Sequence, residues 1–296
     1  MMEKLSRKTY YKPDENIIKK MKDTFYNCPT AVSYCRSLKI PEEVMNENID
    51  ILYDFASDVN YCKRCPGIDN CIKENQLLVT KVVYDDGILE RQLTPCKKLL
   101  EKMKLKNQFM VMDFDPDWLN KDLKQLDSSA ARSKVLKKYV SFCKHKSDEW
   151  IYLTGEKNTG RSFVAASLAI DLARKEIGPI AFLNCPQRFR QLSDLNYKNQ
   201  DLFQRTLDSY SNVPILVLDD FGNEYKNDFI RDTVFEILNK RANQKLMTFI
   251  TSDLTIEEIV TLYSTSKAAG VRARQIGRLL NNNVGEEINL GEISIY

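Results

Sequence analysis

The sequence predicts an α/β fold in which helices flank a parallel sheet, preceded by a small helical domain that contains a β-hairpin. Two observations predict it. From residue 128 onward, short apolar runs of strand length alternate with longer helical patterns, as in parallel strands joined by crossover helices. Before residue 105 the pattern differs, because two helical segments precede a cysteine cluster and two strand-like runs.

Length and composition fit two globular domains. A chain of 296 residues is long enough for two, and we expect them at 1–105 and 128–296, joined by a linker at 106–127. The 43% hydrophobic and 29% charged content is ordinary for a globular protein, and the net charge of +3 gives no polybasic signal. No apolar run approaches the ~20 residues that span a membrane. We therefore expect a cytoplasmic protein without membrane contact, whose cysteines are reduced or bind metal.

The N-terminal third begins with two amphipathic helical patterns. One covers residues 15–26 and places Ile18, Met21 and Phe25 on one face. The second opens at Pro41, a residue favoured in the first turn of a helix, and continues past Phe55. A domain this small has a limited core, so a bound metal would add stability.

Four cysteines of this domain predict a structural zinc site. Cys62, Cys65 and Cys71 follow the pattern C-x-x-C-x5-C with polar and turn-forming residues between them, and such a knuckle places two thiolates on one tetrahedral ion. Runs 77–84 and 88–94 read as strands joined by an Asp-Asp-Gly turn. That hairpin would return Cys96 to the side of Cys71 as the fourth ligand of Zn²⁺. The alternative is four free thiols.

Residues 155–162 carry the spacing of a phosphate-binding loop, G-x-x-x-x-G-K-[ST], with Arg161 in place of lysine. An apolar run at 150–153 precedes the loop, and an alanine-rich helical segment follows it. In such loops backbone N–H groups surround the phosphates, and the hydroxyl at Ser162 would reach Mg²⁺. The predicted nucleotide-binding residues are Gly155, Glu156, Lys157, Asn158, Thr159, Gly160, Arg161, Ser162 and Phe163.

A second apolar run, 214–218, ends in Asp219 and Asp220. This is the Walker B pattern, in which a central strand delivers an aspartate to the metal beside the phosphates. We assign Asp219 to Mg²⁺ and Asp220 to polarising the attacking water. Either pattern alone could be a buried strand capped by turn residues, but both occur here in the required order. The carboxyl ends of the strands would bring residues 155–162, Asp219, Asp220 and Asp253 to one edge of the sheet.

At this point the sequence resembles the DnaC/DnaI helicase-loader family of AAA+ ATPases, and the N-terminal cysteines make it similar to DnaI-type primosomal proteins. Residues 155–162, 216–222, 251–253 and 272–279 carry the resemblance. It implies that Asp253 holds the sensor 1 position near the γ-phosphate. It also implies that Arg274 or Arg278, preferably Arg278, is an arginine finger for a neighbouring subunit. Together with the Walker B pattern, the resemblance therefore implies five catalytic residues: Asp219, Asp220, Asp253, Arg274 and Arg278.

The same resemblance implies partners and a role. The zinc domain would dock on the hexameric replicative DNA helicase. The AAA+ domain would bind ATP with Mg²⁺, engage single-stranded DNA and self-associate. The result would be ATP-dependent loading of the helicase during replication initiation or restart, that is, primosome assembly.

Two departures from the family pattern leave alternatives open. Arg161 is larger and more planar than lysine, and Asp253 stands where asparagine is usual, so we expect weak ATP hydrolysis at most. The alternatives are an IstB-like transposition ATPase and a degenerate nucleotide-binding adaptor without turnover. The triplet Arg188-Phe189-Arg190 suits either single-stranded DNA or the start of an amphipathic helix.

Overall fold

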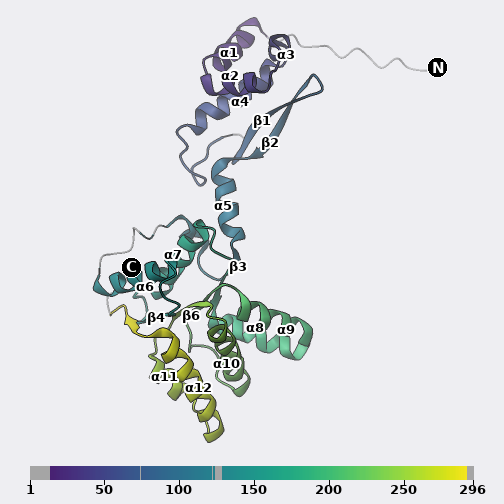
Figure 1. Ribbon diagram of the computed structural model, residues 1–296. Coiled ribbons are helices and arrows are strands. Elements are labelled where there is room, and N and C mark those ends of the chain that lie inside the picture. Colours follow the sequence, from purple (N-terminus) through teal and green to yellow (C-terminus); the bar gives the residue numbers. More distant parts are fainter. Residues whose placement is uncertain (1–13, 74, 122, 124–128, 292–296) are drawn as a thin grey trace, which may run out of the picture. The chain divides into compact units, whose positions relative to one another are not determined.

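The computed structural model describes residues 14–73, 75–121, 123 and 129–291. The chain divides into two compact units between Met103 and Lys104, and each is described by itself (Figure 1). Within the described ranges, no helix is both long and apolar enough to cross a membrane.

The N-terminal unit combines four helices with a β-hairpin, in which α4 packs on the hairpin strand β1 and the other helices pack around α4. Its helices are α1 (Glu15–Tyr26), α2 (Pro29–Ser37), α3 (Glu42–Glu47) and α4 (Ile49–Cys62), and α5 (Lys97–Asn107) follows the hairpin. The core includes Phe25, Cys28, Cys35, Leu52 and Val82. The first predicted helix is confirmed as α1. The helix expected to open at Pro41 is instead two helices, because Asn48 departs from helical geometry at φ −112° and ψ 37°.

The predicted hairpin is confirmed. Strands β1 (Leu78–Asp85) and β2 (Ile88–Pro95) pair antiparallel, with Asp85 opposite Ile88. The two turn residues Asp86 and Gly87 have positive φ values of 48° and 80°, as tight hairpin turns require. The hairpin also returns the chain to its start, because the Cys96 N–H donates to the Leu77 carbonyl at 2.7 Å.

The C-terminal unit is built on a parallel sheet of six strands in the order β3-β5-β6-β7-β4-β8. The strands are β3 (Phe109–Met112), β4 (Ile151–Thr154), β5 (Ile180–Asn184), β6 (Ile215–Asp219), β7 (Met247–Thr251) and β8 (Glu287–Asn289). The predicted α/β class is therefore confirmed for this unit.

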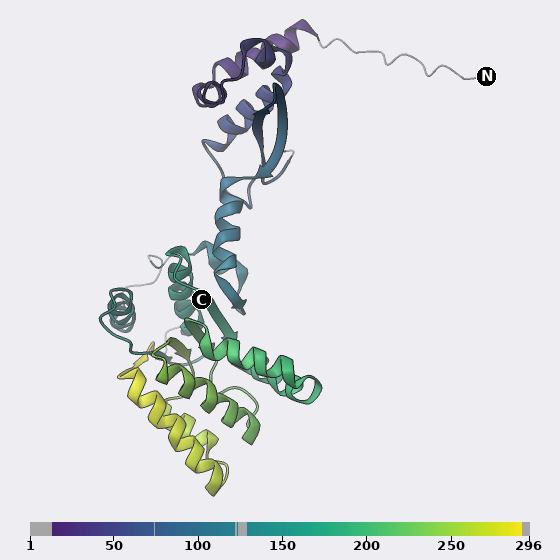
Figure 2. The ribbon, with the colours of Figure 1, turned by 45° about the vertical axis from the view of Figure 1, so that its right-hand side comes forward.

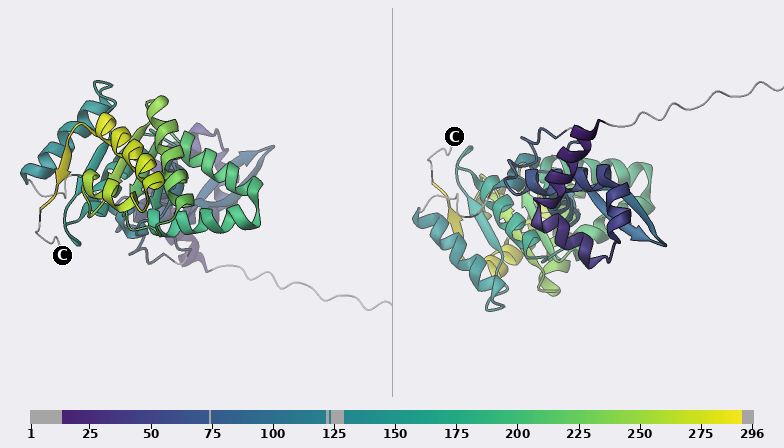
Figure 3. Two further views of the ribbon diagram at one scale, coloured as in Figure 1. Left: turned by 90° about the horizontal axis from the view of Figure 1, so that it is seen from below. Right: turned by 90° about the horizontal axis from the view of Figure 1, so that it is seen from above.

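Helices cover both faces of the sheet. Helices α6 (Ala130–Cys143) and α7 (Arg161–Arg174) pack on one face, and Ile151, Val217 and Phe249 point towards them. The other face holds α8 (Cys185–Lys198), α9 (Gln200–Asn212), α10 (Asp228–Asn243), α11 (Ile256–Tyr263) and α12 (Lys267–Val284). Figure 2 shows α8 and α9 as a helical pair, and Figure 3 shows the same pair from two further directions.

The structure differs from the sequence prediction at the expected linker, 106–127. Residues of this segment form β3, which pairs with β5 at the edge of the sheet, and the 3-10 helix η1 (Pro116–Asn120). Phe114 and Leu119 are buried in the core beside α7. The strand has only four residues, so its apolar run is too short to stand out among the charged residues around it. Residues 122 and 124–127 of the expected linker lie outside the described ranges.

Candidate nucleotide site

The loop between β4 and α7 has a fixed backbone shape. Gly155 and Gly160 have φ values of 143° and 82°, which side chains other than glycine rarely adopt. The Thr159 hydroxyl donates to the Glu156 carbonyl at 2.8 Å. From α6, Arg132 donates to the Thr159 carbonyl at 3.1 Å. The loop is thus held from inside and from a neighbouring helix.

A pocket of about 490 Å³ opens at this loop. Lys157, Asn158, Gly160, Arg161, Ser162 and Phe163 line it from the loop and α7, Asp220 and Asn223 from the segment after β6, and Trp118 from η1. The pocket lies where β4 and β6 end at the carboxyl edge of the sheet, the usual ligand position in such folds. Trp118 packs edge to face against Phe163, with ring centroids 5.4 Å apart.

Arg161, the residue that departs from the loop pattern, is buried with 6% of its surface exposed. Its Nη1 has no hydrogen-bond partner among the described residues. A buried guanidinium nitrogen without a partner is costly, so a bound anion would relieve the cost. This observation, together with the glycine loop and the helix N-terminus, shows that the residues fit a phosphate group.

The two residues assigned to Mg²⁺ come together. The Asp219 carboxylate accepts hydrogen bonds from the hydroxyls of Ser162 and Thr251, the latter at 2.6 Å. Burial raises the pKa of Asp219 to about 6, partly offset by these hydroxyls and by the charge of Arg161. A buried carboxylate beside a hydroxyl is a ligand pair suited to a hard divalent cation. Ser162 and Asp219 would hold Mg²⁺ here.

Asp220 and Asp253 occupy different surroundings. Asp220 lines the pocket, and its N–H donates to the Thr251 hydroxyl at 3.0 Å. Asp253 does not line the pocket; its carboxylate accepts from the Asn223 side chain at 3.0 Å. Thr251, rather than Asp253, is the residue of its strand that contacts Asp219. Asn223, Thr251 and Trp118 are site residues that the sequence patterns did not single out.

Arg274 and Arg278 lie four residues apart on α12, so they share one face of the helix, and both are exposed. Neither lines the pocket of its own chain. The triplet beginning at Arg188 is not an exposed binding strip, because Phe189 is 2% exposed and Arg188 pairs with Asp113 at 2.5 Å. Its interpretation as the start of an amphipathic helix, α8, is the one the structure supports.

The four cysteines of the N-terminal unit line one pocket of about 380 Å³. Cys62 ends α4 and Cys96 follows β2. Backbone N–H groups lower the pKa of Cys71, whereas burial raises that of Cys62. Within the described ranges, no group of three or more His, Cys, Asp or Glu side chains has an arrangement that could hold a metal ion. The structure therefore gathers Cys62, Cys65, Cys71 and Cys96 without forming a coordination shell.

The C-terminal fold and its pocket define a class: an α/β protein with a P-loop and a Walker B strand, built to bind a nucleotide. Comparison with known proteins then gives the family. A model described as IstB-like ATP binding protein matches residues 76–271, and the chain belongs to this family.

Individual relatives bear out the resemblance to helicase loaders. The replicative helicase loader DnaI of Bacillus subtilis (strain 168) is 24% identical over 250 residues, covering 81% of this chain and 79% of that protein. Two crystal structures share the fold over 65% of this chain. One is of DnaI, with a TM-score of 0.56 and 22% identity over 100% of its length. The other is a putative primosome component from Streptococcus pyogenes serotype M3, with a TM-score of 0.52 and 20% identity over 98% of its length.

Proposed function

We propose that this protein is an ATP-dependent loader of the replicative DNA helicase onto single-stranded DNA during replication initiation or restart. The single observation that carries the nucleotide part is the meeting of Ser162, Asp219 and Thr251 beside the P-loop pocket. The loader part is supported by the resemblance to DnaI, which extends over both units. We place the protein in the cytoplasm, where the helicase acts.

In this proposal the chain's residues have separate tasks. Backbone N–H groups of the loop and the charge of Arg161 bind the phosphates, and Ser162 with Asp219 holds Mg²⁺, which would supply charge neutralisation when bound. Asp220 accepts the proton of the attacking water. Asp253, through Asn223 at the pocket rim, orients the site. Arg274 and Arg278 face outwards and act on a neighbouring copy, so the AAA+ unit must self-associate.

The N-terminal unit is proposed as a zinc-stabilised docking module for the helicase hexamer. Four thiols line one pocket, and zinc binding would require them to close to the ~2.3 Å of zinc–sulfur bonds. Four thiolates leave no open position for catalysis, so the metal would be structural.

Two alternative functions each have an observation in their favour. The family description favours an IstB-like transposition ATPase. Arg161 favours a nucleotide-binding adaptor without turnover, because the usual lysine is missing.

One experiment separates the partner classes. The full chain is mixed with the replicative helicase of its host, with and without ATP, and complex mass is measured by light scattering. We expect a defined complex whose formation is retained in the single-site variant Asp220→Asn. Failure to bind the helicase, combined with binding to a transposase from the same host, would replace the loader proposal.

A second experiment tests turnover. Steady-state ATP hydrolysis is measured with helicase and single-stranded DNA present, for the natural chain and for Asp220→Asn. We expect hydrolysis above the variant's rate. Equal rates would leave a nucleotide-binding adaptor as the better description.

A further inference from the structure

The turn after β6 contains a buried carboxylate that the proposed chemistry does not use. Glu224 is 2% exposed. One of its oxygens accepts from the Gly222 N–H at 2.8 Å, and the other accepts from the Tyr263 hydroxyl. A buried carboxylate is retained only where good hydrogen bonds compensate for lost hydration. Glu224 therefore closes the turn at one end and contacts α11 at the other.

This turn holds Asp220 in an unusual conformation. Asp220 has a φ of 54°, which is left-handed for a residue with a side chain. The next residue, Phe221, is fixed at both backbone groups: its N–H donates to the Thr251 carbonyl at 2.9 Å, and its carbonyl accepts from the Ser252 hydroxyl at 2.6 Å. Such strain persists only where the surroundings over-determine it. Glu224 supplies the constraint on the far side of the turn.

Helix α11 lies directly against the same turn. A Cβ on Gly222 would come within 2.5 Å of the Ile259 side chain. The rings of Phe221 and Tyr263 are 6.4 Å apart. The α11 helix in turn contacts α12 closely, because a Cβ on Gly277 would lie 2.4 Å from the Val260 side chain. A displacement of the turn after β6 would therefore move α11, and through α11 it would also move α12.

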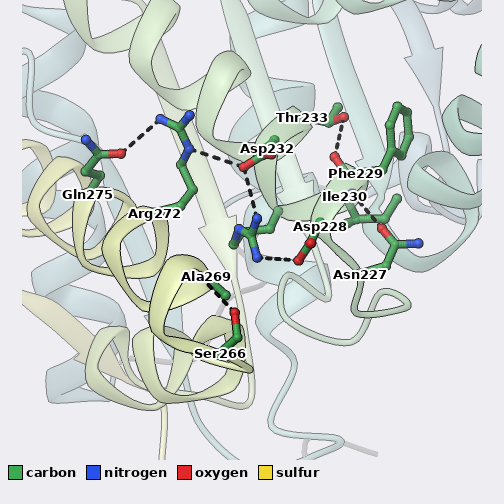
Figure 4. Close-up of polar contacts among 11 residues, drawn as sticks. Asn227, Asp228, Phe229, Ile230, Asp232, Thr233, Ser266, Ala269, Arg272 and Gln275 are labelled. Carbon is green, nitrogen blue, oxygen red and sulfur yellow. Dashed lines mark hydrogen bonds and ion pairs between the residues drawn. The ribbon is translucent and has the colours of Figure 1, made fainter.

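The far side of α12 is also fixed. Arg272 on α12 donates to Asp232 of α10 at 3.2 Å and lies over the Phe235 ring at 4.0 Å from its centroid. Figure 4 shows the Arg272 side chain reaching Asp232. Asp232 also accepts from the guanidinium of Arg231, which binds Asp228 as well. Helix α12 thus rests between α10 and α11, and α11 contacts the turn that carries Asp220.

We propose that Glu224 is a positioning residue: it holds Asp220 at the pocket and, through Tyr263, couples that turn to the α11–α12 pair that carries Arg274 and Arg278. The inference rests on the proposed nucleotide function. Only a carboxylate accepts from both donors at once, since an amide presents one oxygen and one NH₂. Glutamine at 224 could still accept from the glycine N–H, but its NH₂ would donate toward Tyr263 and leave the buried tyrosine proton without its acceptor.

The functional test compares Glu224→Gln and Tyr263→Phe with Tyr225→Phe, a matched control at a neighbouring side chain that is 79% exposed. ATP affinity is measured by titration calorimetry and turnover at saturating ATP. We expect turnover to fall about tenfold or more in Glu224→Gln, because misplaced reacting groups cost rate rather than binding. ATP affinity should stay within about threefold. Equal loss of affinity and turnover would overturn the positioning role.

A second measurement decides the coupling without requiring turnover. Amide hydrogen exchange is followed in the nucleotide-free full chain over residues 219–224, 256–263 and 161–174. In Tyr263→Phe we expect the first two segments to exchange faster together while the third is unchanged. Faster exchange in 256–263 alone would overturn the coupling. If the natural chain shows no turnover, the proposed hydrolysis fails, and the exchange result still decides this inference.

Discussion

Arg161 is the residue at which this nucleotide site departs from the common P-loop. Its guanidinium is buried, and one nitrogen lacks a partner among the described residues. A planar fork and a compact ammonium present their donors differently to phosphate oxygens. In the proposed nucleotide site this substitution would change how phosphates are held, while the glycine loop, the N-terminus of α7 and the Ser162–Asp219 contact are all present.

The first prediction is that Arg161→Lys tightens ATP binding and speeds hydrolysis. Lysine would restore the compact charge that P-loops place against the β- and γ-phosphates. Calorimetry gives the affinity and phosphate release gives the rate, with the exposed Arg205→Lys as control. If neither quantity changes, Arg161 is not a phosphate-binding residue.

Asp219 predicts a pH-dependent stability difference. Burial raises its pKa from 3.8 to about 6 in the folded chain, so its contribution favours folding below about pH 4 and is lost as the pH rises through about 6. At pH 7.5, without metal or nucleotide, we expect Asp219→Asn to be more stable than the natural chain. Its free energy of unfolding should be higher by about 1–3 kcal/mol. Denaturant unfolding at pH 7.5 and pH 4 measures it, and a gain that is equal at both pH values contradicts the assignment.

At the scale of elements, α12 carries two glycines with opposite surroundings. At Gly277 a Cβ would meet Val260 at 2.4 Å, whereas at Gly270 the nearest atom is the mobile end of Arg274 at 3.4 Å. We expect Gly277→Ala to cost about 1–3 kcal/mol through overpacking. Gly270→Ala should be neutral or stabilise by up to about 1 kcal/mol through helix propensity. Denaturant unfolding of the pair tests this, and equal effects would contradict the close α11–α12 contact.

The hairpin makes a prediction for the zinc site. It brings Cys96 beside Leu77 and into the pocket with Cys62, Cys65 and Cys71. Elemental analysis of the full chain should give one zinc ion, and Cys96→Ser should weaken zinc retention about 10- to 100-fold against a competing chelator. Cys143→Ser, in the other unit, is the matched control. Unchanged affinity in Cys96→Ser would remove this thiol from the ligand set.

Some elements could be read from the sequence because local chemistry decides them. The Asp-Asp-Gly turn, the glycine loop and the apolar run that ends in Asp219 each demand a particular backbone, and each forms as expected. Trp118 could not be found this way. It reaches the pocket because β3 joins the sheet edge next to β5, which is a long-range pairing that a four-residue strand hardly signals.

The sequence also could not predict which residue at the end of β7 contacts the neighbouring strand β6. Thr251, Ser252 and Asp253 are all polar, and the family resemblance directs attention to Asp253. In the structure the Thr251 hydroxyl contacts Asp219, while Asp253 binds Asn223. Which of three successive residues meets a neighbouring strand depends on register, and register is set by the whole sheet.

For the whole molecule, the division between Met103 and Lys104 predicts two unfolding transitions. A ligand stabilises only the folded unit that binds it. In scanning calorimetry we expect a strong chelator to lower one transition and ATP with Mg²⁺ to raise the other. A single transition that responds to both reagents would show that the two units unfold as one.

The unpartnered nitrogen of Arg161 also has a practical consequence for handling the protein. A buried cation with a free donor at the N-terminus of α7 is also a site where a small oxyanion can bind. Phosphate or sulfate in a purification buffer should therefore compete with ATP, and apparent affinities measured in such buffers will be too weak. Exchange into a chloride buffer before titration would give the affinity of the site for ATP without this competition.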